Sequence, residues 1–237
     1  MKAVIFGGLG TIANTSYLQR KAFNSAFEQL SIEWHWGEEE YRGLLIQAGG
    51  GSRITDYNNK HGGLPKSVTP DQVHKIKTSL FHRFMTDTKL PLREGVQWVI
   101  DSAKFNKIKL VFATTTSQGN IDILLSSAGL NPSTFDIISN CDLVNEPKPE
   151  PDVYQYCLEK LNILAVDTIA IEDARTGVVS AVSAGISCVA FPNEFTAEHS
   201  YVEAVEKVGD LEKSTHLNAF FCIGLLTALL VRESKSS

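Results

Sequence analysis

The chain has 237 residues, of which 43% are hydrophobic and 21% charged, as in an ordinary globular protein. The net charge of −5 and the lack of a basic stripe argue against nucleic acid as a main partner. The cysteines lie far apart and lack metal-binding spacing, which favours reduced core thiols in a cytoplasmic protein.

The stretch from Lys2 to Ile12 begins with an apolar run at positions 3 to 6, which predicts a buried strand. Glycines at positions 7, 8 and 10 then predict a tight loop that leads into a helix beginning near Thr15. A loop at the carboxyl end of the first strand is where α/β folds place ligands.

Between residues 14 and 90 the sequence predicts helices and no strand. Apolar residues recur at helical spacing from 15 to 30, and further helices are expected at 38–47, 52–59 and 70–90. Thr69-Pro70-Asp71-Gln72 is typical of a capped helix start. Gly49, Gly50 and Gly51 predict a flexible break, and Trp34, His35 and Trp36 are expected to pack between helices rather than stack on a ligand.

After Pro91 the pattern alternates between strands and helices. Strands are expected at 108–113, 135–139, 168–171 and 187–191, and the helices at 95–104, 120–128, 151–161 and 176–184. This alternation predicts an α/β fold with a parallel sheet covered by helices on both faces. The first strand belongs to the same sheet, so the helical block is an insertion.

The run from Ala219 to Val231 is apolar over 13 residues, which is short of the roughly 20 that a membrane helix needs. It is expected to pack on the core rather than serve as a peripheral anchor or a self-association surface. No secretory signal is visible, so the chain is expected in the cytoplasm, or in an organelle after processing, without a membrane partner.

Four polar segments are expected to meet at the carboxyl edge of the sheet. They are the loop from Gly7 to Thr11, the segment Thr114–Ser117, Lys148, and the pair Glu172-Asp173. Hydroxyls and helix N-termini can hold a phosphate, and a lysine can neutralise it. Adjacent carboxylates can hold Mg²⁺.

These segments, in this order, resemble the haloacid dehalogenase superfamily, in the branch with a helical cap inserted after the first strand. That branch includes beta-phosphoglucomutases, phosphoglycolate phosphatases and CbbY-like sugar-phosphate phosphatases. The resemblance spans nearly the whole chain and rests on Val4-Ile5-Phe6, Gly10-Thr11, the helix from Tyr17 to Phe27, Ala113-Thr114-Thr115-Thr116, Lys148-Pro149-Glu150-Pro151-Asp152, and Ile171-Glu172-Asp173 followed by Gly177.

The resemblance implies a Rossmann-like core of residues 1–13 and 91–237 and a helical cap of residues 14–90, with hinges near 13–14 and 91–92. It implies phosphate binding by Thr114, Thr115 and Lys148, and a Mg²⁺ site at Glu172 and Asp173. Arg53 is expected either to contact an anionic substrate or to lie in a solvated turn. The implied ligand is a small phosphorylated metabolite.

The first motif departs from the family pattern Asp-x-Asp-Gly-Thr. Gly10-Thr11 fix the register, so the nucleophile falls on Gly7 and the acid/base on Leu9. Glycine cannot attack phosphorus and leucine cannot transfer a proton. Losing the nucleophile also removes a Mg²⁺ ligand, which predicts weakened metal binding at a partial site.

Three hypotheses follow from this departure. In the first, the chain is catalytically impaired and binds a phosphorylated metabolite or a protein partner. In the second, it is an active phosphatase or phosphoglucomutase-like enzyme with a displaced nucleophile, such as Thr11 or a carboxylate of the cap. In the third, Gly8-x-Gly10-x-x-Ala13 binds a dinucleotide, with a second strand over Leu30–Trp34 and Glu33 on the ribose. The first is favoured on chemical grounds.

Overall fold

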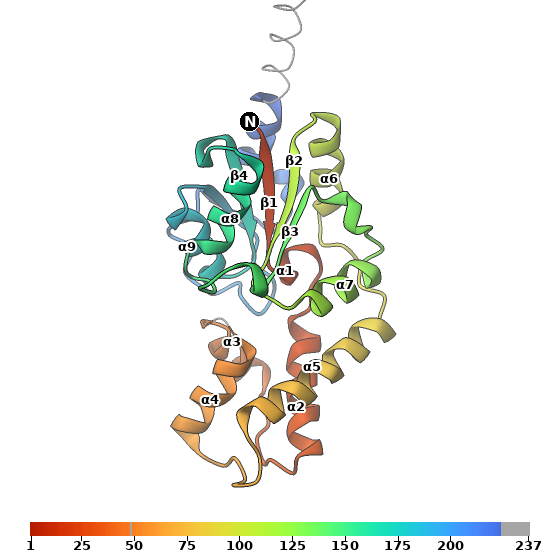
Figure 1. Cartoon of the computed structure of the whole chain (residues 1–237), viewed down its shortest axis with the longest axis vertical. Coiled ribbons are helices and arrows are strands. Elements are labelled where there is room, and N and C mark those ends of the chain that lie inside the picture. The colour runs from red at the N-terminus through yellow and green to blue at the C-terminus, as the bar shows by residue number, and fades with distance from the viewer. Residues whose placement is uncertain (48, 224–237) are drawn as a thin grey trace, which may run out of the picture.

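The computed structural model describes residues 1–47 and 49–223 of the chain. Its centre is a six-stranded parallel sheet with the strand order β3-β2-β1-β4-β5-β6. The strands are β1 (Ala3–Gly7), β2 (Lys109–Ala113), β3 (Ile137–Ser139), β4 (Thr168–Glu172), β5 (Ser187–Ala190) and β6 (Glu206–Lys207). Their carboxyl ends point toward a second, helical lobe (Figure 1). The α/β fold with a parallel sheet is confirmed.

Helices cover both faces of the sheet. On one side lie α6 (Val96–Phe105) and α7 (Gln118–Ser127), and on the other α8 (Asp152–Leu161) and α9 (Arg175–Ser183) (Figure 1). Successive residues of β1 enter different apolar clusters: Val4 and Phe6 join one, and Ile5 joins the other. This alternation buries both faces of the strand, as a continuous apolar run predicts. Short 3₁₀ turns in the described chain lie at Pro132–Thr134, Cys141–Leu143, Ala165–Asp167 and Leu211–Lys213.

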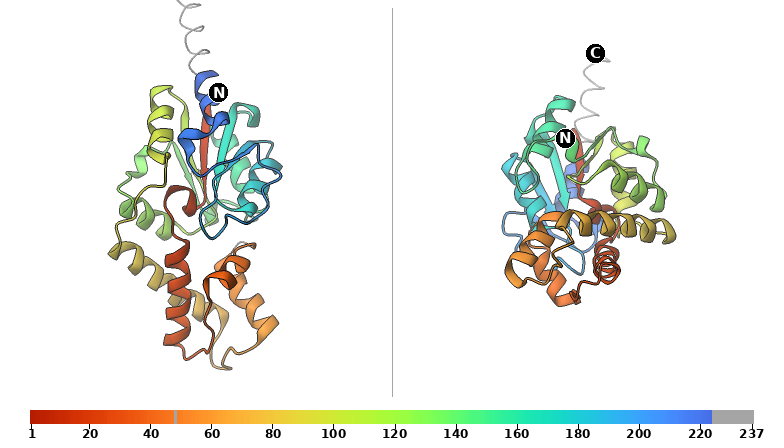
Figure 2. Two further views of the ribbon diagram at one scale, coloured as in Figure 1. Left: turned by 180° about the vertical axis from the view of Figure 1, so that it is seen from behind. Right: turned by 60° about the horizontal axis from the view of Figure 1, so that its bottom comes forward.

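The second lobe consists of helices that follow β1 in the chain and lie beyond the carboxyl edge of the sheet (Figures 1 and 2). They are α2 (Ser16–Gln29), α3 (Glu38–Leu44), α4 (Gly50–His61) and α5 (Pro70–Asp87). The predicted start of α5 is confirmed, because Thr69 and Gln72 form a capping box.

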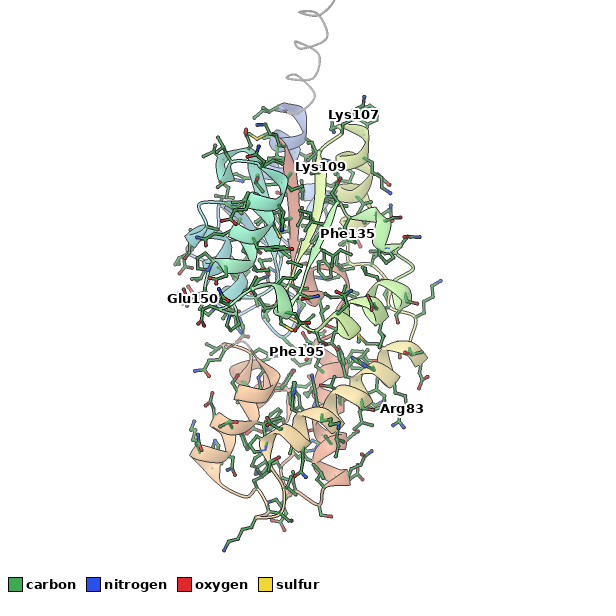
Figure 3. The ribbon with its side chains drawn as sticks, in the orientation of Figure 1. Arg83, Lys107, Lys109, Phe135, Glu150 and Phe195 are labelled. Atoms are coloured by element: carbon green, nitrogen blue, oxygen red, sulfur yellow. The ribbon has the colours of Figure 1, made fainter. Side chains whose placement is uncertain are left out.

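An aromatic cluster holds this lobe together. Trp36 is fully buried, with its ring centroid 4.7 Å from that of Phe23 and 4.8 Å from that of Phe27. Trp34 lies 5.4 Å from Phe27, so both tryptophans pack between helices as predicted, whereas His35 is exposed. Phe195, from the core, lies between the two lobes (Figure 3).

The glycine-rich segments differ from their prediction in two places. After Gly8, residues Leu9–Ile12 form a short helix, α1, where a loop was expected. The hydroxyl of Thr11 donates to the carbonyls of Gly7 (3.0 Å) and Gly8 (2.8 Å), which stabilises this turn. Gly50 and Gly51 do not form a break but begin α4, because Gly49 alone makes the turn at a φ of +95°.

The segment Leu30–Trp34 is not a strand, which corrects the second strand of the dinucleotide hypothesis. It leaves α2 as irregular chain, where Trp34 Nε1 donates to the carbonyl of Gly62 at 2.9 Å. The other predicted helices and strands are present and differ only at their ends, while β6 was not predicted.

The predicted terminal element is described only in part. Residues 215–223 are helical, and Phe221 is buried with its ring 5.4 Å from that of Trp98. Residues 224–231 of the apolar run lie outside the described residues. Within the described chain, no helix has the length and apolar character needed to cross a membrane. Cys157 and Cys188 are buried, whereas Cys141 and Cys222 are exposed, so only two of the four are core thiols.

Candidate functional site

A cavity of about 230 Å³ lies between the carboxyl edge of the sheet and the helical lobe. All four polar segments singled out in the sequence line it: the turn after β1, the threonines after β2, Lys148, and the acidic pair after β4. From the helical lobe it is lined by Thr15, Ser16, Gln19, Leu45, Gln47, Gly49, Gly50 and Arg53. The meeting of these segments follows from the parallel sheet, because the carboxyl ends of its strands share one edge.

The threonine segment is held in place from two sides. Thr114 is buried, and its Oγ1 accepts a hydrogen bond from the backbone N–H of Thr116 at 3.3 Å. Asn120 donates to Thr116 Oγ1 at 2.6 Å, and Asn120 Oδ1 lies 2.7 Å from Nε2 of His82 on α5. The loop of the predicted phosphate site is therefore linked to the helical lobe.

Lys148 and Glu172 form a buried ion pair at the floor of the cavity. Lys148 Nζ donates to Glu172 Oε1 at 2.5 Å and to the carbonyl of Ala113 at 3.0 Å. Tyr154 donates its hydroxyl to the same Oε1 at 2.5 Å, and burial followed by the nearby Glu172 charge raises the pKa of Tyr154 well above its usual value. Tyr154 was not predicted as a site residue. One signal is its place on the inward face of α8, one turn from the buried Cys157.

Asp173 is the second carboxylate at this edge. Burial, and then the neighbouring Glu172 charge, raise the pKa of Asp173 to about 6. Asn193 Nδ2 donates to Oδ2 of Asp173 at 3.3 Å. The backbone carbonyl of Asp173 accepts hydrogen bonds from the hydroxyls of Thr196 and Tyr201. The loop from Asn193 to Tyr201 thus positions this carboxylate.

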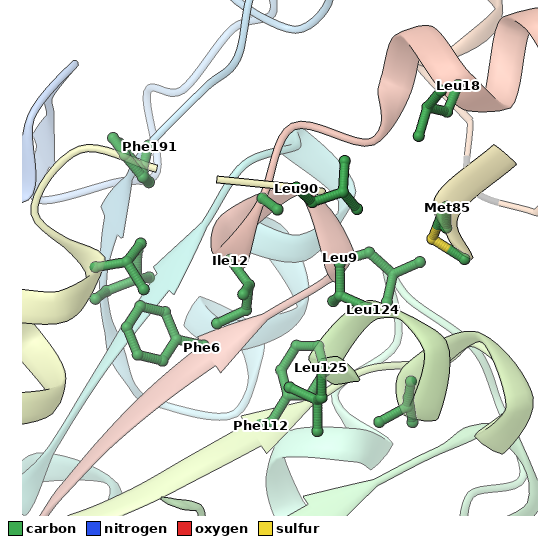
Figure 4. Packing of buried hydrophobic residues seen from close by; sticks show 14 of the residues in the cluster. Phe6, Leu9, Ile12, Leu18, Met85, Leu90, Phe112, Leu124, Leu125 and Phe191 are labelled. Carbon is green, nitrogen blue, oxygen red and sulfur yellow. The ribbon is translucent and has the colours of Figure 1, made fainter. Parts of the chain in front are cut away.

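The two positions of the first motif are occupied differently. A Cβ built on Gly7 would overlap Oε1 and Cδ of Glu172, so the carboxylate of β4 fills the space of a residue-7 side chain. Leu9 is 8% exposed and belongs to the apolar cluster that also contains Leu18, Met85 and Leu124 (Figure 4). Residue 9, the acid/base position that the resemblance implies, thus carries a packed apolar side chain.

The donor set of this site does not fit Mg²⁺, which prefers several hard oxygen ligands in near-octahedral geometry. Gly7 supplies no carboxylate, and Oε1 of Glu172 is already bound to Lys148 and Tyr154. Oε2 of Glu172 and the carboxylate of Asp173 remain, and one oxygen of Asp173 is bound to Asn193. Among the described residues, no group of three or more His, Cys, Asp or Glu side chains is placed to hold a metal ion.

The helical lobe contributes two buried cations. Arg53 is 8% exposed and donates to the carbonyls of Leu44 (2.8 Å) and Gln47 (2.9 Å), so the solvated-turn alternative for Arg53 is wrong. Lys77 is 4% exposed and donates to Oε1 of Gln19, a cavity-lining residue, at 3.0 Å. Burial, and then the Arg53 charge, lower the pKa of Lys77 to about 7.

Lys77 was missed in the sequence, although a signal for it exists. It lies on α5 four residues after Val73 and four before Phe81, both of which are buried. A lysine in the middle of an apolar helical stripe is a candidate for a buried functional cation, because lysines are seldom fully buried without a partner.

The structure also bears on two of the competing hypotheses. Thr11, proposed as a displaced nucleophile, is fully buried and its hydroxyl donates to two backbone carbonyls. No carboxylate of the helical lobe is among the residues that line the cavity in the described chain. Glu33, the proposed ribose ligand, is exposed and does not line the cavity either.

Comparison with known proteins identifies the family. Residues 4–191 match the haloacid dehalogenase-like hydrolase family. The chain is 35% identical over 206 residues to Protein CbbY of Cereibacter sphaeroides, covering 86% of this chain and 90% of that protein. It is similar to the crystal structure of CbbY from Rhodobacter sphaeroides in complex with phosphate, with a TM-score of 0.84 and 33% identity over 90% of this chain and 96% of the other.

A variant of that CbbY in complex with xylulose-(1,5)bisphosphate matches with the same TM-score, identity and coverage. The match over residues 4–191 is consistent with the parallel sheet, with the helical insertion after β1 and with the four polar segments at the sheet edge. The chain belongs to the haloacid dehalogenase-like hydrolase family.

Proposed function

We propose that this chain binds a small phosphorylated metabolite in the cavity between the sheet and the helical lobe, and that it does not hydrolyse it through a phosphoaspartyl intermediate. The observation that carries the proposal is the pairing of a built polar cavity with a first motif in which Gly7 and Leu9 stand at the catalytic positions.

At the core end of the cavity, the threonine segment and Lys148 support binding of a phosphate group. Thr114 and Thr115 bring hydroxyl groups to the end of β2, and the backbone there leads directly into α7. Hydroxyls, backbone N–H groups near a helix start and a lysine are the donors that suit a phosphate oxygen.

At the cap end, Arg53, which lines the cavity, and Lys77, which lies behind the cavity-lining Gln19, support binding of a second anionic group. Both are buried, they repel each other, and in the described chain neither has a carboxylate ion-pair partner. Because an uncompensated buried cation is unfavourable, an anion from the ligand would stabilise the lobe as well as the complex. The related CbbY variant is complexed with a bisphosphate, which suggests a sugar bisphosphate as the ligand here.

The residues at positions 7 and 9 support catalytic impairment, because neither can carry out its step of a phosphoaspartyl reaction. A phosphoaspartyl reaction needs a carboxylate nucleophile and a proton-transfer group, and residues 7 and 9 are glycine and leucine. Removing one member of a catalytic unit already forfeits most of its benefit, and here two are replaced.

The proposal includes a division into two domains, a core of residues 1–13 and 91–237 and a cap of residues 14–90. The connections at 13–14 and 91–92 would act as hinges, so that closure of the cap excludes water from the ligand. Two contacts already join the proposed core and cap, one between His82 and Asn120 and the other between Tyr41 and Phe195.

The test is isothermal titration of the purified chain with xylulose-(1,5)bisphosphate, its monophosphates and xylulose, accompanied by a phosphate-release assay with Mg²⁺. Binding that requires at least one phosphate group, without measurable phosphate release, is the expected result. An Arg53→Met variant should bind the bisphosphate at least tenfold more weakly, whereas Lys75→Met, an exposed change on α5, should bind normally. Phosphate release that is lost in Asp173→Asn would refute the impairment.

A further inference from the structure

The carboxylate of Glu172 lies where the side chain of residue 7 would be. A Cβ on Gly7 would overlap Oε1 and Cδ of Glu172, and the hydroxyl of Tyr154 would lie 2.5 Å from it. A Cβ on Gly177, at the start of α9, would overlap the same carboxylate. The carboxylate of Glu172 therefore occupies space that is open only because residues 7 and 177 are both glycine.

The contacts of this carboxylate explain its position. Its Oε1 accepts hydrogen bonds from both Lys148 and Tyr154, and the side chains of Lys148 and Glu172 are 7% and 2% exposed. A buried lysine requires a nearby anion, because an unpaired buried charge is strongly unfavourable. With no carboxylate at residue 7, Glu172 is the anion that reaches Lys148.

This pairing has consequences for both ligands of the site. A carboxylate that accepts from a lysine and a tyrosine through Oε1 is a poor ligand for a divalent cation, since only Oε2 is left for the cation and the adjacent ammonium group repels it. A lysine that is neutralised by a carboxylate is also a weaker phosphate ligand, since the phosphate must compete with that carboxylate.

We propose that Glu172 has taken the place of the missing residue-7 carboxylate as the counter-ion of Lys148, so that the core end of the cavity binds phosphate without a divalent cation and in competition with Glu172. The competition between phosphate and Glu172 rests on the proposed function. The loss of metal binding depends only on the geometry of Gly7, Lys148 and Glu172. Glu172 is thus a specificity-determining residue, not a metal ligand.

Two titrations of the wild-type chain test the metal part and need no variant. The first is Mn²⁺ alone, followed by electron paramagnetic resonance, and the second is inorganic phosphate with either EDTA or Mg²⁺. We expect no bound Mn²⁺ at millimolar concentration and a phosphate affinity that Mg²⁺ changes less than about twofold. Bound Mn²⁺, or phosphate binding that Mg²⁺ strengthens severalfold, would overturn the proposal.

The variant Glu172→Gln tests the competition. It keeps the shape of the side chain and removes its charge, so phosphate in EDTA should bind roughly tenfold more tightly, as expected for removing one nearby like charge. Glu159→Gln, an exposed change on α8, should leave the affinity unchanged. Weaker phosphate binding by Glu172→Gln would overturn the competition. If wild type and variant both fail to bind phosphate and Mn²⁺, the proposed function and the competition fail while the loss of the metal site holds.

A double-mutant cycle tests the position of the carboxylate without any ligand. Gly7→Ala should lower the melting temperature by roughly 5 °C or more, because the added methyl group overlaps Glu172. In a Glu172→Ala background, Gly7→Ala should lower the melting temperature by less than half as much. The remaining decrease would come from the overlap of the new methyl group with the Tyr154 hydroxyl. Equal effects in the two backgrounds would show that Glu172 does not fill this space.

Discussion

Replacing Lys77 with methionine should make the protein more stable at neutral pH while weakening its binding of a bisphosphate. Lys77 is 4% exposed, and its ammonium group lies 4.8 Å and 4.9 Å from the ring centroids of Phe23 and Phe81 and donates to the neutral side chain of Gln19. Methionine retains the apolar contacts of the lysine stem and removes the buried charge.

The size of the effect follows from the pKa of Lys77, which burial lowers from 10.5 to about 7. Between these two values the unfolded chain holds the proton and the folded chain does not, so the free energy of unfolding rises with pH across this window. At about 1.4 kcal/mol for each pH unit, the upper limit of the rise is about 5 kcal/mol. The lost hydrogen bond to Gln19 offsets about 1 kcal/mol of the gain from the substitution.

The assay is urea unfolding of wild type and Lys77→Met at several pH values from 6.5 to 10. We expect the variant to be more stable by a few kcal/mol near pH 7 and to lack most of the rise in stability that the wild type shows toward pH 10. Lys75→Met, which changes an exposed lysine of the same helix, should follow the wild-type curve. Parallel curves for wild type and Lys77→Met would show that Lys77 does not titrate between pH 7 and 10.

Three further outcomes are expected. Leu9→Asp should lower the free energy of unfolding by about 1–3 kcal/mol in urea unfolding, because it places a carboxylate against the apolar cluster at the cavity wall. Leu9→Met should change it by less than about 1.5 kcal/mol. Affinity for a bisphosphate, measured by titration, should fall as pH rises above about 7, since Lys77 loses its proton there; a constant affinity from pH 6.5 to 9 would contradict this. Arg93→Met should lower the melting temperature by several degrees in a thermal scan. The guanidinium of Arg93 donates to the carbonyls of Gly10, Phe191 and Pro192, all at 2.7 Å, and so joins α1 to the loop after β5. An unchanged melting temperature would show that these hydrogen bonds do not stabilise the fold.

The fold could be predicted from the sequence because its signals are local. Apolar runs such as Val4-Ile5-Phe6 mark buried parallel strands, and their alternation with helical patterns fixes the architecture. Thr69 and Gln72 mark a helix start by a mechanism that needs no tertiary contact. The position of the four segments at one edge then follows from the parallel sheet.

The features that differ from the sequence-based prediction depend on contacts between residues far apart in the sequence. Gly50 and Gly51 are helical because the chain turns at Gly49, which has a positive φ, and α4 begins directly after it. His74 of α5 lies next to both glycines. The role of Glu172 could not be predicted, because its side chain reaches into a space that an absent side chain on another strand leaves open. Lys77, by contrast, is marked in the sequence by its position on an apolar helical stripe between Val73 and Phe81.

The site is proposed to bind a phosphorylated ligand and not to convert it. Phosphorus-31 NMR of xylulose-(1,5)bisphosphate with a stoichiometric amount of the wild-type chain and Mg²⁺ tests both parts in one sample. We expect ligand resonances that are shifted or broadened by binding and no growth of an inorganic phosphate resonance over hours. Growth of that resonance, absent when Asp173→Asn replaces the wild type, would contradict the claim, and so would ligand resonances that the protein leaves unchanged.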